Sequence, residues 1–199
     1  MNERLISKAE RRAQREIELG AKIRALPDRR YGVILADPEW KWMPYNEITG
    51  GDRSAANHYP VSDTVKIAAR DIASISAKDS ALMLWAIPSM IPAALAVMSF
   101  WGFTYKSQMV WVKHAMGTGY WFRFKHEVLL IGTRGKFVAP AMGTQIPSVL
   151  FAKRREHSQK PDQVAEMIER LWPNLPKIEL NRRGPARPGW DAWGQEVVE

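Results

Sequence analysis

Residues 31–40 read Tyr-Gly-Val-Ile-Leu-Ala-Asp-Pro-Glu-Trp, a short apolar run followed at once by a carboxylate, a proline and a tryptophan. Such a run is typical of a strand that is buried on both faces of a parallel sheet. We therefore predict a strand over 31–36. In open α/β sheets, ligands bind beyond the carboxyl ends of the strands. The predicted strand would deliver Asp37, Pro38 and Trp40 to that position.

Further strands are expected where the same apolar character recurs. Runs over 81–87 and 127–131 have it, and a weaker candidate covers 177–180. Residues 105–112 lie close in sequence to 127–131, so we expect these two segments to form an antiparallel pair near the end of the sheet.

Helices are expected between these strands, over 63–73, 90–101 and 161–172. The second stops at Gly102, a residue type that suits the C-terminal cap of a helix. Strands that alternate with helices favour an open parallel sheet covered on both faces, so the sequence predicts an α/β fold.

The composition fits one compact domain. The chain has 199 residues, 46% of them hydrophobic, which is enough for one sizeable core but not for two full domains. No apolar run approaches the length of a membrane span, there are no cysteines, and the four histidines lack the close spacing of zinc ligands. We therefore expect a cytoplasmic protein that has no disulfide, no metal site and no membrane contact.

The charge balance favours a polyanionic partner. The formal net charge is +8 and the sequence pI is about 9.8, and each neutralised phosphate would release counterions, although such a surplus also serves solubility. Helical spacing over 3–25 predicts a basic N-terminal helix within residues 1–28, followed by the main domain over 29–199. This helix fits an arm that touches phosphate, a helix packed on the domain, or an element that binds a partner; the sequence does not separate these.

Asp37, Pro38 and Trp40 supply the parts that methylation of an exocyclic amine requires. The lone pair of the adenine amino group is delocalised into the ring, so the nitrogen is a poor nucleophile. A carboxylate and a backbone carbonyl that accept its two N–H bonds would hold the nitrogen and stabilise the positive charge that develops on it. A flat aromatic ring can stack on a base that has left its helix. Asp-Pro after a strand is also an ordinary turn, and Trp40 also fits a role in covering the core.

Further short motifs follow residues 37–40 in order along the chain. They include His58-Tyr59-Pro60, Leu84-Trp85, Val110-Trp111-Val112-Lys113, Gly119-Tyr120-Trp121-Phe122-Arg123, His157-Ser158-Gln159-Lys160-Pro161, Ile178-Glu179-Leu180 and Gly189-Trp190 with Trp193-Gly194. This collinear series over residues 31–196 resembles the adenine-N6 methyltransferases typified by the seventy-kilodalton subunit of the messenger-RNA adenosine methyltransferase (MT-A70), in particular their bacterial and phage DNA-modifying branch.

One position departs from that family. Its motif is Asp-Pro-Pro-Trp, and this chain has Glu39 where the second proline is expected. The acceptor carbonyl belongs to the first proline, Pro38, so the chemistry survives the change. Glu39 can still loosen the loop or place negative charge beside phosphate.

The resemblance implies a fold, a cofactor and a set of contacts. It implies a single-domain, Rossmann-like fold that binds S-adenosylmethionine and is circularly permuted (beta-class order), so that the catalytic motif precedes the main cofactor-binding strand. The cofactor contacts that it implies are Asp37, Lys160, Leu180, Asn181, Arg183, Gln195 and Glu196.

Lys160 also stands out on physical grounds. It precedes Pro161, which suits the first turn of a helix, and a lysine there is a poor cap whose charge opposes the helix dipole. Together with the helix N-terminus, Lys160 could hold the methionine carboxylate of the cofactor. The alternative is that Ser158 caps the helix and Lys160 points into solvent.

Basic and aromatic side chains in the predicted loops are candidates for contact with nucleic acid. Basic groups can track phosphate while aromatic rings stack on unpaired or flipped bases. We expect Tyr59 and Trp121 to contact bases, whereas Trp85, Trp101 and Trp111 belong to the core. The basic candidates are Arg123, Lys125, Arg134, Lys136, Lys153, Arg154 and Arg155.

The sequence as a whole predicts an S-adenosylmethionine-dependent, site-specific adenine-N6 methyltransferase that acts on DNA, with Asp37, Pro38 and Trp40 as its catalytic residues. DNA is preferred to RNA because the chain is short and lacks added RNA-binding modules. Two alternatives stay open: an RNA adenine-N6 methyltransferase, and a catalytically silent, nucleic-acid-binding partner subunit. Glu39 keeps the second one open, whereas Asp37, Trp40 and Lys160 argue against it. The oligomeric state, homo- or hetero-oligomeric, stays open as well.

Overall fold

A computed structural model describes residues 26–41, 63–117, 121–155, 159–182 and 184–194. The helix expected over 3–25 lies outside these ranges, and so do Tyr59, Arg183, Gln195 and Glu196. Within the described ranges, no helix has the length and apolar character needed to cross a membrane.

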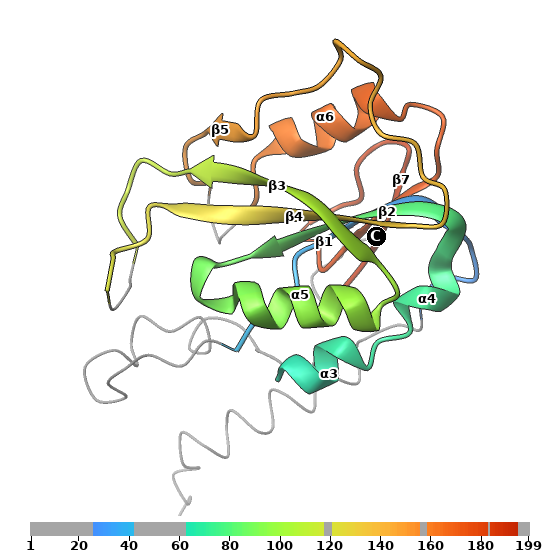
Figure 1. Ribbon diagram of the computed structural model, residues 1–199, viewed down its shortest axis with the longest axis horizontal. Coiled ribbons are helices and arrows are strands. Elements are labelled where there is room, and N and C mark those ends of the chain that lie inside the picture. The colour runs from blue at the N-terminus through green and yellow to red at the C-terminus, as the bar shows by residue number, and fades with distance from the viewer. Residues whose placement is uncertain (1–25, 42–62, 118–120, 156–158, 183, 195–199) are drawn as a thin grey trace, which may run out of the picture.

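Seven described strands form a single mixed sheet in the order β5-β3-β4-β2-β1-β6-β7 (Figure 1). In this sheet β4 runs antiparallel to both of its neighbours, whereas the other pairs are parallel. The strands are β1 (Tyr31–Ala36), β2 (Ser76–Ala86), β3 (Thr104–Val112), β4 (His126–Arg134), β5 (Val149–Phe151), β6 (Lys177–Leu180) and β7 (Trp190–Trp193). We call the side where the six parallel strands end the carboxyl end of the sheet, and the opposite side the amino end.

The strand predictions are largely confirmed. β1 and β6 have the predicted bounds, and β2 and β4 extend the predicted runs. The predicted antiparallel pair is β3 with β4, but β4 lies inside the sheet between β3 and β2, because the short parallel strand β5 pairs with β3 on its other side. The predictions did not include β5 and β7.

The helices lie between the strands with one unexpected interruption. The helix expected over 63–73 is two short helices, α3 (Thr64–Ala68) and α4 (Ile72–Ile75), because the Asp71 side chain accepts a hydrogen bond from the Ser74 N–H and starts a new helix. The other predicted helices are confirmed as α5 (Ile91–Phe100), preceded by the 3₁₀ turn η3 (Pro88–Met90), and α6 (Asp162–Leu171). Gly102 has φ +83°, as expected for the cap of α5.

The two faces of the sheet carry separate hydrophobic cores. Along β1 the side chains alternate, so Ile34 and Ala36 join the core under α3, α4 and α5, while Val33 and Leu35 join the core under α6. Figure 1 shows α5 and α3 on one side of the sheet and α6 on the other. The prediction of a sheet covered on both faces is therefore confirmed.

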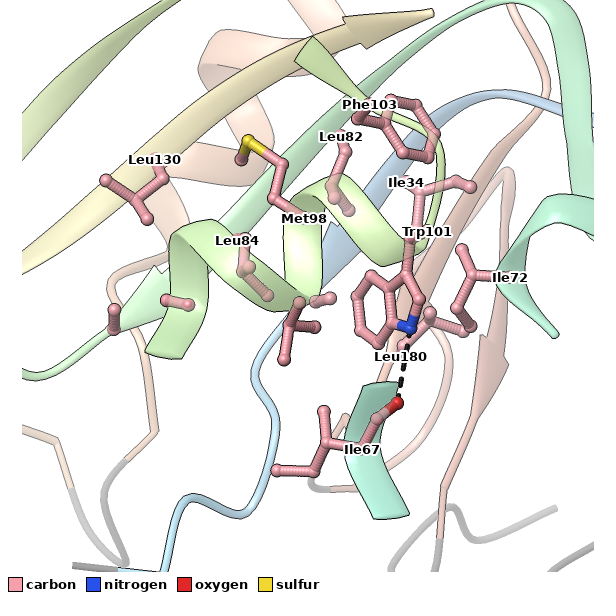
Figure 2. Close-up of a cluster of buried hydrophobic side chains, with 14 of the residues drawn as sticks. Ile34, Ile67, Ile72, Leu82, Leu84, Met98, Trp101, Phe103, Leu130 and Leu180 are labelled. Atoms are coloured by element: carbon pink, nitrogen blue, oxygen red, sulfur yellow. Dashed lines mark hydrogen bonds between the residues drawn. The ribbon is translucent and has the colours of Figure 1, made fainter. Parts of the chain in front are cut away.

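Tryptophan side chains fix the helices against the sheet. Figure 2 shows Trp101, 2% exposed, donating its indole N–H to the Ile67 carbonyl of α3 at 3.2 Å. Burying so large a ring contributes about 2–3 kcal/mol of hydrophobic stabilisation, and the hydrogen bond removes the cost of its polar edge. Trp85 and Trp111 are also buried, as predicted. This packing joins α3, and the turn that follows it, to the core next to β1.

Candidate active site

The chain turns sharply where β1 ends at the carboxyl end of the sheet. The Asp37 N–H donates to the Leu180 carbonyl at 3.2 Å, so the end of β1 stays attached to the end of β6. The Trp40 N–H donates back to the Pro38 carbonyl at 2.8 Å, which closes a tight turn. The predicted catalytic residues Asp37, Pro38 and Trp40 therefore lie together in one compact turn after β1. We call residues 37–40 the catalytic turn.

Trp40 lies inward from this turn. Its ring is 7% exposed and belongs to the core under α3 to α5, and its Nε1–H donates to the Trp85 carbonyl at 2.8 Å. Trp40 therefore anchors the turn to β2. Its predicted role as a stacking surface for a base stays a prediction, and it would require part of the ring to become uncovered.

Lys160 points into this site rather than into solvent. Its Nζ lies 2.6 Å from Asp37 Oδ2 and 3.3 Å from Glu127 Oε2, and only 14% of its side chain is exposed. The ammonium also lies 5.8 Å from the centre of the Trp85 ring, over its face. The alternative in which Lys160 points into solvent is therefore wrong.

Glu127 extends this network to the neighbouring strand. It is the second residue of β4, it is buried, and its other oxygen accepts a hydrogen bond from Lys113, the residue after β3. Burial alone would raise the pKa of Glu127, but the charges and hydrogen bonds of Lys160 and Lys113 outweigh it and hold the pKa below its ordinary value. The two cations thus keep a buried carboxylate ionised beside Asp37.

The start of α6 lies next to Lys160 in the chain and has no side-chain cap. Pro161 occupies the N-cap position instead of the first turn. The first N–H groups of a helix without such a cap favour an anion. An ammonium and a helix N-terminus together fit the carboxylate of an amino-acid-like ligand.

A second charged network lies on the other side of the turn. Glu39 pairs with Arg70, and its other oxygen accepts from Asn181 Nδ2 at 2.9 Å. Asn181 follows β6 directly with φ +62°, and its N–H donates to the Trp193 carbonyl at 2.6 Å. Leu180 is 1% exposed, so its side chain belongs to the core, and its carbonyl accepts the Asp37 N–H.

The predicted nucleic-acid contacts fall into two groups. Trp121 is 87% exposed, and Arg123, Lys125 and Arg154 are also exposed; all four lie beside the start of β4 or the end of β5, at the carboxyl end of the sheet. Arg134 is the last residue of β4 and Lys136 follows it, about 30 Å from the start of this nine-residue strand. These two candidates therefore lie at the amino end of the sheet, away from the other four.

Comparison with known proteins decides the family. The MT-A70 family profile matches residues 31–196. The chain belongs to the MT-A70 family.

Individual relatives agree with this assignment. The chain is 32% identical over 189 residues to the type II methyltransferase M.MunI of a Mycoplasma species, covering 87% of this chain and 81% of that protein. It is 27% identical over 180 residues to the N(6)-adenosine-methyltransferase catalytic subunit METTL3 of Homo sapiens, and 27% identical over 181 residues to a probable N(6)-adenosine-methyltransferase MT-A70-like protein of Oryza sativa subsp. japonica. These matches cover 84% of this chain but 28% and 23% of the two longer relatives.

Two residues of this MT-A70 site were missed at the level of the sequence. Glu127 was assigned only to an apolar strand, although a carboxylate at the start of such a run is a detectable signal of a buried, paired charge. Arg70 gave no signal, because it was placed inside a continuous helix. The break between α3 and α4 places it beside Glu39 instead.

Proposed function

We propose that this MT-A70 protein transfers a methyl group from S-adenosylmethionine to the N6 amino group of adenine in DNA. The observation that carries the proposal is the ion pair between Asp37 and Lys160, which joins the predicted catalytic carboxylate to the predicted cofactor-binding cation at 2.6 Å. The family match over residues 31–196 supports the same chemistry.

The turn can hold an amine with two acceptors. Asp37 offers carboxylate oxygens, one of which faces Lys160, and Pro38 offers its carbonyl. The Pro38 carbonyl already accepts the Trp40 N–H, but a carbonyl oxygen has two lone pairs and can accept a second hydrogen bond. Both acceptors are anchored, Asp37 through its N–H to β6 and Pro38 through Trp40 to β2, so little reorganisation is needed as charge develops on the nitrogen.

The residues of the site suit S-adenosylmethionine. When bound, the cofactor supplies an electrophilic methyl group. Lys160 and the uncapped start of α6 would hold its carboxylate, and the backbone after β6, at Leu180 and Asn181, would contact the rest of it. Arg183, Gln195 and Glu196 remain proposed contacts from the resemblance. Because β1 with the catalytic turn precedes β6 in the chain, the circularly permuted order is part of this proposal.

The choice of DNA rests on the relatives. The protein named type II methyltransferase is matched over 81% of its length, whereas the N(6)-adenosine-methyltransferases are matched over about a quarter of theirs. The exposed Trp121, Arg123, Lys125 and Arg154 at the carboxyl end of the sheet would contact the strand that carries the target base. We place this activity in the cytoplasm.

The direct test is methyl transfer from labelled S-adenosylmethionine to adenine-containing DNA and RNA, with nucleoside analysis of the products. We expect N6-methyladenine in DNA and none with Asp37→Ala. Transfer to RNA alone would correct the substrate. Nucleic-acid binding without transfer to either substrate would instead indicate a silent partner subunit, and an active Asp37→Ala enzyme would refute the site.

A further inference from the structure

Glu39 occupies the position where the family motif has its second proline, and its side chain is not a solvated surface charge. Only 12% of the Glu39 side chain and 15% of the Arg70 side chain are exposed. One carboxylate oxygen of Glu39 pairs with Arg70 and the other accepts from Asn181 at 2.9 Å. The substituted residue therefore makes two specific contacts inside the molecule.

The partners of Glu39 also contact one another. Arg70 donates from its second guanidinium nitrogen to Asn181 Oδ1 at 3.2 Å, and its guanidinium lies 5.6 Å from the centre of the Trp193 ring, over its face. Asn181 is attached in turn to Trp193 through its backbone N–H. The three polar side chains thus form a closed triangle that rests on β7.

This triangle joins three separate parts of the fold. Glu39 belongs to the catalytic turn after β1, Arg70 to the break between α3 and α4, and Asn181 to the first position after β6. The φ of +62° at Asn181 is rare for a residue other than glycine, and asparagine tolerates it better than most. The contacts to Glu39 and Arg70 hold the Asn181 side chain in one orientation.

A proline restricts both its own φ and the conformation of the residue before it. Glutamate imposes neither restriction, so the turn of this chain needs another restraint. A largely buried, hydrogen-bonded ion pair with fixed partners can supply it, because removing one partner leaves the other charge largely shielded from water and uncompensated.

We infer that Glu39, Arg70 and Asn181 form a clamp that positions the catalytic turn against the end of β6 and takes over the role of the missing proline. The inference rests on the proposed function, since the clamp matters by holding Asp37 and Pro38 where the amine must bind. All three are positioning residues, and none of them needs to touch the reacting atoms. Misplacement of a catalytic group by about 1 Å can cost about 100-fold in rate.

The first test is a double-mutant cycle on turnover. We expect Glu39→Ala and Arg70→Met each to lower kcat by about 10- to 100-fold, with a smaller change in KM for S-adenosylmethionine, because Lys160 and α6, which would hold its carboxylate, are untouched. The double variant should be no worse than either single one. Glu39→Pro combined with Arg70→Met should recover most of the lost kcat. Additive losses, or unchanged kcat in the folded single variants, would overturn the clamp.

A matched control exists in the same two stretches of chain. Lys41 pairs with Asp63 at 3.0 Å, joining the residue after the catalytic turn to the residue before α3, but 42% and 57% of these side chains are exposed. An exposed pair contributes little. Asp63→Asn should therefore leave kcat unchanged.

A second measurement does not depend on activity. Hydrogen exchange should report faster exchange of the Asp37 and Trp40 amides in Glu39→Ala, by about tenfold or more, while amides of β2 and β4 stay protected. If the wild-type protein transfers no methyl group, the proposed function fails and this measurement still decides the clamp. Unchanged or uniformly faster exchange would overturn it.

Discussion

At the carboxyl end of the sheet Lys160 pairs with carboxylates from other elements, whereas at the amino end Lys177 and Arg30 bond to backbone carbonyls. Lys177 donates to the carbonyls of Pro173 and Leu175, and Arg30 donates to those of Ala73 and Ser76. Burial lowers the pKa of Lys177, and the negative charge of Glu169 opposes part of that shift.

The partners of a buried lysine indicate whether it serves the fold or a ligand. A lysine bonded to fixed carbonyls can change partner only if the backbone moves, so it serves the fold. A lysine bonded to carboxylates, as Lys160 is to Asp37 and Glu127, can exchange them for groups of a ligand. The comparison predicts that changes at the carboxyl end affect activity and binding as well as stability, and that equivalent changes at the amino end affect stability alone.

The largest effect is expected on kcat at Asp37. Asp37→Asn should lower kcat by about 10³-fold, because a neutral amide does not stabilise the charge that develops on the amine. Asp191, which accepts from Tyr31 at 2.6 Å and Arg29 at 3.0 Å at the amino end, is the matched control. Asp191→Asn should cost about 1 kcal/mol of unfolding free energy and leave kcat within twofold. Steady-state kinetics and denaturant unfolding check both, and a large kcat loss in Asp191→Asn would break the comparison.

The next largest effect is expected on the affinity for S-adenosylmethionine, when Lys160 is compared with Lys177. Lys160→Met should weaken S-adenosylmethionine binding by about 10- to 100-fold, since a hydrogen-bonded charge pair contributes about 1.5–3 kcal/mol. Lys177→Met should leave the affinity unchanged while altering the melting temperature. Isothermal titration calorimetry on folded samples measures both affinities. Equal losses in the two variants would mean that Lys160 acts only through stability.

Acid should lower the free energy of unfolding more through Glu127, at the carboxyl end of the sheet, than through Glu169, near the amino end. The pKa of Glu127 lies below its ordinary value, so ionised Glu127 contributes stability that is complete above pH 4.5 and is lost as the pH falls through the folded-state pKa. Glu169, near the amino end, also has a lowered pKa, chiefly through its hydrogen bond from Arg187, but 38% of its side chain is exposed. Glu127→Gln should flatten the acid part of the stability curve, and Glu169→Gln should flatten it much less. Urea unfolding between pH 3 and 7 measures this, and equal flattening would contradict the ranking.

The smallest effect concerns phosphate contacts. Lys125→Ala, at the carboxyl end, should reduce the slope of log affinity for DNA against log salt by about 0.9, which amounts to a few-fold change in affinity. Lys136→Ala, at the amino end, removes the same charge and should leave the slope unchanged. Fluorescence anisotropy over a salt series compares them. A reduced slope for Lys136→Ala would mean that the nucleic acid extends over the amino end.

The strands buried on both faces could be predicted because their own residues determine them. β1 is apolar over its whole length, and its bounds agree with the sequence. β6 has apolar residues only at Ile178 and Leu180, which made it the weaker candidate, and its bounds agree as well. β5 and β7 have three and four residues and lie at the two edges of the sheet, so neither gives a run long enough to stand out. Their pairing depends on a neighbouring strand, which a local pattern does not reveal.

The candidate site was predicted as a set of positions rather than as a network. The catalytic turn and Lys160 follow from the motif, from the resemblance and from the poor cap at α6. The pairing of Lys160 with Asp37 and Glu127, and of Glu39 with Arg70, joins residues far apart in sequence. Both pairings require the sheet order and the break between α3 and α4, so the sequence alone did not predict them.

The reversed direction of β4 has a consequence for how such an enzyme can diversify. In a wholly parallel sheet the chain would have to cross back over a face after β3. Here β3 ends and β4 begins at the carboxyl end, beside Glu127 and Lys160, so the chain passes between two neighbouring strands without crossing a face. The register of β3 with β4 is set by pairs within the two strands, so the chain between Lys113 and Lys125 can change in length without altering it. Relatives can therefore differ here while they keep the same arrangement of Asp37, Lys160 and Glu127.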